Sequence, residues 1–263
     1  QVKDPEKLKR IAHEWNIETE DKDIYTLAHE VAETALLEYG KPFGTQRFLK
    51  RAPEHTQKLW HDAEIEPRAI DREVSTALHM THMGNSSLPE ALVRQALRCG
   101  LSDGWGGSMM GTEFSDVLFG TPKPVDSTAN IGVMEKDNVN IVVHGHDPSL
   151  SEMIVYYAND PEMLALAKSV GAKGITISGV CCTANEVAMR HGIPMAGNFL
   201  SQENVVLTGA CEAIVVDVQC IFPALGPLSK CFHTKFVTTS PIARMPDSDF
   251  IEFHEETAAE NAK

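Results

Sequence analysis

The fold of this chain is decided by a short β-branched run that ends in two histidines, residues 140–146, NIVVHGH. Three further runs of this kind follow it, at residues 174–178, 213–218 and 236–239. Helical patterns separate the runs, at residues 149–157, 161–170, 183–191 and 225–231. Continuous apolar strands that alternate with helices predict a parallel sheet covered by helices on both faces, with right-handed crossovers. The second half of the chain is therefore expected to be a Rossmann-like α/β domain.

The first half of the chain has a helical pattern and no convincing strand. Apolar residues recur at helical spacing over residues 21–39, and glycine and proline end this pattern. Further helices are expected at residues 67–83 and 87–99. The second of these opens with a capping box formed by Ser87 and Glu90.

A proline-punctuated stretch, residues 120–124, separates the helical half from the alternating half. We therefore predict two domains. The first is a mostly helical region over residues 1–126, and the second is the α/β domain over residues 127–263.

The composition describes a globular chain with an acidic surface. Its 263 residues are 43% hydrophobic and 23% charged, which is enough for one large domain or two smaller ones. The formal net charge of -14 argues against nucleic acid and anionic membrane surfaces as partners. No stretch approaches the roughly 18 consecutive apolar residues of a membrane span, and no signal-peptide pattern opens the sequence. We therefore expect a cytoplasmic protein.

Both ends of the sequence look like cuts within a longer polypeptide. The chain begins at Gln1 without an initiator Met, and it stops at Lys263 inside a helix-like run. A segment of a larger protein is the expectation.

Metal-binding side chains follow three of the expected strands. His144 and His146 close the first strand, Cys181 and Cys182 follow the second, and Cys220 follows the third. The carboxyl ends of strands in an open parallel sheet line the crevice where ligands bind, so these side chains are expected to meet. Imidazole with thiolates selects zinc, copper or iron-sulfur chemistry over magnesium or calcium. The residue types leave zinc and iron-sulfur open, and the competing interpretation is a set of buried polar residues and thiols without a metal.

The segments around these residues resemble the catalytic subunit of the anaerobic, nickel-iron-sulfur carbon monoxide dehydrogenases. The resemblance is carried by residues 138–148 (NVNIVVHGHDP), 179–186 (GVCCTANE), 190–194 (RHGIP), 217–220 (DVQC), 102–108 (SDGWGGS) and 117–122 (VLFGTP). It covers the chain from residue 66 onward. It implies the architecture of the hybrid-cluster, prismane-like proteins and identifies this chain as a central fragment of such a subunit.

The resemblance implies that CO and water interconvert with CO2, two protons and two electrons at a nickel-containing four-iron, four-sulfur cluster. By their places in the shared motifs, His146 and Cys182 would hold the iron outside the main cubane. Cys220 would hold a cubane iron. His144 and Cys181, the other members of their pairs, are expected to turn away from the cluster and support it.

The family's remaining cluster ligands and a catalytic Lys belong to a later domain, and additional four-iron, four-sulfur clusters and proton-relay histidines precede Gln1. With half of the ligands present, this segment alone is expected to be inactive. The resemblance also implies a homodimer and a ferredoxin-like electron carrier. It fits both a stand-alone dehydrogenase and a subunit of an acetyl-CoA synthase/decarbonylase complex.

Two other functions and three weaker site residues complete the expectations. The chain could instead be a hybrid-cluster protein with hydroxylamine reductase-like chemistry, or a metal-binding scaffold subunit without turnover. His79 and His82 lie three apart on one helix face and are candidates for a role next to the cluster. Asp103 is a third candidate, beside the glycine-rich residues 104–107, which predict a tight turn.

Overall fold

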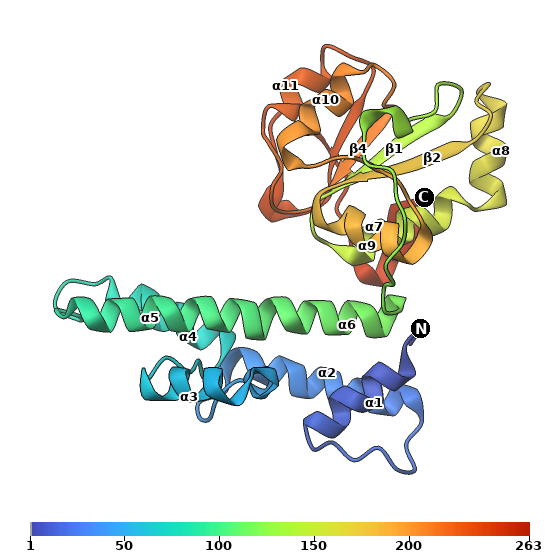
Figure 1. The fold of residues 1–263 in the computed structure, drawn as a ribbon. Helices are drawn as coiled ribbons and strands as arrows, with labels where there is room; N and C mark the ends of the chain where they lie inside the picture. The colour runs from blue at the N-terminus through green and yellow to red at the C-terminus, as the bar shows by residue number, and fades with distance from the viewer. Residues whose placement is uncertain (1) are drawn as a thin grey trace. The chain divides into compact units, whose positions relative to one another are not determined.

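A computed structural model describes residues 2–263 and divides the chain into two compact units (Figure 1). One unit extends to Thr121 and the other begins at Pro122. The boundary predicted from the sequence lies between residues 126 and 127, inside the irregular stretch that opens the second unit. No helix among the described residues has both the length and the apolar character needed to cross a membrane.

The first unit is built from helices. They are α1 (Pro5–Glu14), α2 (Ile24–Gly40), α3 (Glu54–Asp62), α4 (Ile70–Met80), α5 (Pro89–Ser102) and α6 (Met109–Phe119), with the 3-10 turn η1 (Arg47–Arg51) and the π-helical turn η2 (Asp103–Ser108). The three predicted helices are confirmed as α2, α4 and α5, whereas α1, α3 and α6 are absent from the prediction. α1 buries one stripe of side chains, which includes Leu8 and Ile11.

Two local predictions in this unit are wrong. Ser87 does not cap α5, because Leu88 is the N-cap and its side chain makes no capping hydrogen bond. The glycine-rich stretch is not a tight turn, since η2 joins α5 to α6 in one continuous helix (Figure 1). Glycine is needed there for packing: a Cβ on Gly106 would lie 2.5 Å from the Gln46 amide nitrogen.

The second unit contains the predicted parallel sheet. Its strands are β1 (Val139–His144), β2 (Ile175–Val180), β3 (Met195–Gly197), β4 (Ala213–Val216), β5 (Lys235–Thr238) and β6 (Asp249–Phe250). They pair in the order β3-β2-β1-β4-β5-β6, and every pairing is parallel. This is the strand order of a doubly wound Rossmann sheet, so the predicted fold class is confirmed. The sequence does not reveal β3 and β6, which are too short to show a pattern.

Helices cover both faces of this sheet (Figure 1). They are α7 (Pro148–Ala158), α8 (Pro161–Ser169), α9 (Cys181–His191), α10 (Gln202–Leu207), α11 (Leu225–Ser229) and α12 (Ala258–Ala262), with the 3-10 turns η3 (Ile131–Val133), η4 (Phe199–Ser201), η5 (Pro241–Ala243) and η6 (Glu255–Thr257). Alternation along β1 sends Val142 into the core beneath α10 and α11, and Val143 into the core beneath α7 and α9. Both faces of β1 are therefore apolar, which explains its unbroken β-branched run.

Close packing of α9 on β2 gives a test of this arrangement. A methyl group on Gly179 would lie 2.2 Å from Cβ of Ala184, so Gly179→Ala forces the helix away from the strand. We expect this substitution to lower the free energy of unfolding by about 1–3 kcal/mol, measured by urea denaturation. Gly174→Ala is the matched control, because its new methyl group would have Asn138 Oδ1 as nearest neighbour at 3.6 Å. Equal losses for both variants would contradict the packing argument.

Candidate metal centre

The site lies at the carboxyl ends of β1, β2 and β4. β1 pairs with β2 on one side and with β4 on the other, and the strand order reverses between β1 and β4. Ligands of doubly wound sheets bind in the crevice at this switch point. His146 follows β1, Cys181 follows β2 and Cys220 follows β4, so the topology brings them to one place.

The ligating atoms of His146, Cys181 and Cys220 all lie within 4.8 Å of one another. His146 and Cys181 are half-buried and Cys220 is exposed. Metal bonds to nitrogen and sulfur are about 2.0–2.3 Å long, so two donors of one ion lie at most about 4.6 Å apart, slightly less than the upper limit of 4.8 Å here. One imidazole and two thiols at this spacing fit a soft metal or the irons of an iron-sulfur cluster.

Of the adjacent cysteines 181 and 182, Cys181 belongs to this group, whereas the resemblance assigns the ligand role to Cys182. Cys181 was expected to turn away, and the structure differs because its φ of 71° breaks the strand alternation behind that expectation. Cys182 is exposed in the first turn of α9. The two thiols are thus adjacent at the site, and the assignment of Cys182 stays a prediction.

Backbone strain is concentrated at the two cysteine turns. Cys181, Gln219 and Cys220 have φ values of 71°, 66° and 57°, in the left-handed region that glycine favours. Each such residue costs on the order of 1–3 kcal/mol and persists only where its surroundings hold it. The backbone therefore has an unfavourable, left-handed conformation at the two residues that carry the thiols of the group, Cys181 and Cys220.

Asp217 joins the turn after β1 to the turn after β4. Its carboxylate accepts hydrogen bonds from the backbone N–H groups of His146 (2.6 Å) and Asp147 (2.9 Å), and also from that of Val218. Gly145 makes room for this carboxylate, because a Cβ there would lie 1.9 Å from Oδ1 of Asp217. Burial raises the pKa of Asp217 to about 6, against the three N–H donors, which favour the charged form.

The ring of His146 is oriented by a second hydrogen bond across the same gap. Its Nδ1 lies 3.0 Å from the carbonyl oxygen of Val218. A carbonyl can only accept, so Nδ1 carries the proton and Nε2 has a lone pair for a metal. Metal-binding histidines commonly fix their tautomer in this way.

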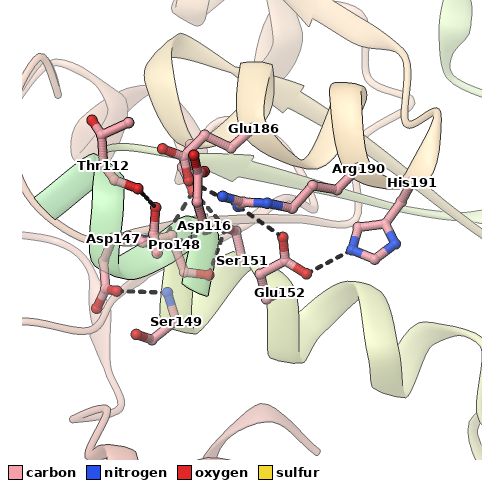
Figure 2. A network of polar contacts seen from close by, with 12 residues as sticks. Thr112, Asp116, Asp147, Pro148, Ser149, Ser151, Glu152, Glu186, Arg190 and His191 are labelled. Carbon is pink, nitrogen blue, oxygen red and sulfur yellow. Dashed lines mark hydrogen bonds and ion pairs between the residues drawn. The ribbon is translucent and has the colours of Figure 1, made fainter. Parts of the chain in front are cut away.

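The first helix after β1, α7, and the turn before it are tied to α9 at both ends of α9. At the site, Thr183 donates from its backbone N–H to the carbonyl of Gly145 (2.9 Å) and from its hydroxyl to the carbonyl of Asp147 (3.2 Å). At the far end, Figure 2 shows Glu152 of α7 bonded to two side chains of α9, Arg190 (3.1 Å) and His191 (2.6 Å). These contacts hold the first turn of α9 against the His146 turn.

The thiols are close enough to influence one another. Burial raises the pKa of the Cys181 thiol to about 12. The backbone N–H of Cys182 opposes this shift, whereas the charges of the Cys182 and Cys220 thiols add to it. Ionising these thiols together requires a nearby positive charge. A metal cation supplies that charge, because a coordinating thiol is deprotonated by the ion it binds.

The three weaker candidates lie in the first unit. His79 ends the exposed face of α4, His82 follows that helix, and their rings are 6.1 Å apart. Asp103 is exposed at the start of η2. Among the described residues none of the three joins the group of His146, Cys181 and Cys220, and their role stays a prediction.

Sequence reasoning missed the residues that support the ligands. Asp217 could have been found, because it follows β4 as His146 follows β1. Thr183 and Gln202 gave no signal, since their partners are backbone groups and side chains brought close only by folding.

Comparison with known proteins connects this geometry to a family. The model of the Prismane/CO dehydrogenase family matches residues 1–263. Carbon monoxide dehydrogenase 1 of Methanosarcina mazei is 52% identical over 262 residues, which is 100% of this chain and 42% of that protein. The carbon monoxide dehydrogenase/acetyl-CoA synthase subunit beta of Moorella thermoacetica is 42% identical over 100% of this chain and 39% of that protein.

A solved structure agrees with the sequence comparison. The Ni-free carbon monoxide dehydrogenase from Thermococcus sp. AM4, produced without the CooC maturase, superposes with a TM-score of 0.96 at 50% identity. The superposition covers 100% of this chain and 42% of that one, so the chain spans about two fifths of the length of these relatives. The resemblance seen in the motifs is confirmed, and the chain belongs to the Prismane/CO dehydrogenase family.

Proposed function

We propose that this chain is the central part of an anaerobic carbon monoxide dehydrogenase. The reaction interconverts CO and water with CO2, two protons and two electrons. The observation that carries the proposal is the group of one imidazole and two thiols at the switch point of the sheet, within 4.8 Å of one another. The names of the relatives favour this reaction over hydroxylamine reductase-like chemistry.

The donor set suits a nickel-iron-sulfur cluster, which supplies a Lewis acid and a redox-active metal when it is bound. His146 would hold one iron through Nε2, because Nδ1 is committed to the Val218 carbonyl. By the resemblance, Cys182 would be the second ligand of this iron. Cys181 is the preceding residue in the sequence. Cys220 would hold a cubane iron.

This chain's other residues prepare the ligands for the cluster. Asp217 fixes the backbone of His146 relative to the turn that carries Cys220. Thr183 fixes the start of α9, where the two adjacent cysteines lie. The remaining ligands and the catalytic Lys are proposed to come from polypeptide outside this chain, so the chain alone would not catalyse the reaction.

The assembly and location follow from the same proposal. We propose a cytoplasmic homodimer that exchanges electrons with a ferredoxin-like carrier. The relative from Moorella thermoacetica is named as a subunit of carbon monoxide dehydrogenase/acetyl-CoA synthase, which supports an acetyl-CoA synthase partner as a further possibility for this chain.

The metal content of the purified protein distinguishes a carbon monoxide dehydrogenase from a hybrid-cluster protein and from a scaffold subunit. In the full-length polypeptide, purified without oxygen, we expect iron together with nickel and CO-dependent reduction of a viologen dye. The physical reason is the soft donor set, which disfavours magnesium and calcium. Iron without nickel would indicate a hybrid-cluster protein, and zinc or no metal would indicate a scaffold subunit.

Single substitutions at the adjacent thiols decide which of them is the ligand. We expect Cys182→Ala in the full-length enzyme to abolish CO oxidation, a loss of more than about 100-fold, because residues that only orient ligands already cost about 10–100-fold. Cys231→Ala is the control, since Cys231 is an exposed thiol after α11. Retained activity in Cys182→Ala, with loss in Cys181→Ala, would move the assignment to Cys181.

A further inference from the structure

The side chain of Gln202, the first residue of α10, is completely buried beside the turn that carries Cys220. Its amide nitrogen donates to the carbonyl oxygens of Phe199 (2.5 Å) and Cys220 (2.9 Å). Its Oε1 accepts from the backbone N–H of Phe222 (2.9 Å) and lies 3.1 Å from His144 Nε2. Every hydrogen-bonding position of this carboxamide is therefore used.

The orientation of the amide follows from these partners. Two of them are carbonyl oxygens, which only accept, and a third is a backbone N–H, which only donates. Exchanging the nitrogen and oxygen of Gln202 would place like groups against each other at all three contacts. Because Oε1 only accepts, His144 Nε2 must be the donor and carries a proton.

His144 connects this amide to the sheet. It is the last residue of β1, it is 1% exposed, and it points to the same face as Val142, where α10 packs. The amide thus joins the end of β1 to the backbone of the Cys220 turn, at the carbonyl of residue 220 and the N–H of residue 222.

We infer that Gln202 is a positioning residue that holds the Cys220 thiol in place for the metal. Cys220 has a left-handed backbone, and its side chain is exposed, so packing of the thiol itself does not hold the turn. The amide contacts hold the backbone directly after the strained residue, at the Cys220 carbonyl and the Phe222 N–H, and supply that restraint. The role toward a metal rests on the proposed function, whereas the restraint on the turn does not.

The test uses two variants in the full-length enzyme. Gln202→Met conserves volume and removes all four amide contacts. Asn140→Leu is the matched control, because Asn140 is also a buried carboxamide of the second unit, 1% exposed, bonded to Glu135, Asn138 and Ala210. It lies near the opposite end of β1, away from the site. Gln202→Glu, which keeps the shape and the acceptor, replaces the methionine variant if that variant does not fold.

Hydrogen exchange reports on the turn without any metal. In the metal-free protein, we expect the peptide over residues 219–222 to exchange faster in Gln202→Met than in wild type, because the Phe222 N–H loses its acceptor. The same peptide should be unchanged in Asn140→Leu. Unchanged exchange in Gln202→Met would overturn the inference.

The loaded enzyme reports on the metal. We expect Gln202→Met to weaken retention of cluster metal against a chelator by about 10–100-fold and to alter the electron paramagnetic resonance spectrum of the cluster. Asn140→Leu should leave both unchanged, and an equal effect of both variants would reduce Gln202 to a merely structural role. If the wild-type protein holds no nickel and iron, the proposed function fails, and the exchange measurement still decides whether Gln202 holds the turn.

Discussion

The carboxylate of Asp217 is the interaction on which the site depends. It accepts hydrogen bonds from three backbone N–H groups in two turns, one after β1 and one after β4. The carboxylate therefore connects the two turns across the point where the strand order reverses. An open parallel sheet leaves its strand ends splayed at this point, which creates room for a ligand. The buried carboxylate keeps that room while fixing the backbone of His146 relative to the turn that carries Cys220. Gly145 is required beneath it, because any side chain there would collide with the carboxylate.

The hydrogen bonds that position the candidate ligands come from different elements of the fold. Most of them are made to backbone groups of the turns that carry these ligands. Thr183 holds the start of α9 to the His146 turn, and the Val218 carbonyl orients the imidazole. Gln202 bonds the backbone of the Cys220 turn at the carbonyl of Cys220 and the N–H of Phe222. These groups sit on or next to a sheet whose two faces are packed with apolar side chains. A rigid scaffold of this kind can maintain the left-handed backbone of Cys181 and Cys220, which a mobile loop would relax.

The relatives of this chain are longer than the chain itself. The chain spans about two fifths of its relatives, and its three grouped donors fit a cluster that needs more ligands than they provide. The sheet nevertheless brings those donors together using residues of this chain alone. The arrangement of these three donors is thus built into a single α/β unit, and the supporting hydrogen bonds described above belong to the same unit.

The sequence by itself determined the fold class and the edge of the sheet where the site lies. Strand periodicity is local, so the runs before His146, Cys181 and Cys220 were readable, and parallel topology required their ends to meet. Short elements such as β3 and β6 carry too few residues to show a pattern. That Cys181 is grouped with His146 and Cys220 could not be read from the sequence, because the left-handed φ of Cys181 depends on its surroundings. The hydrogen bonds of Asp217 and Gln202 could not be predicted from the sequence either, since each side chain joins groups that come together only when the sheet and its helices pack.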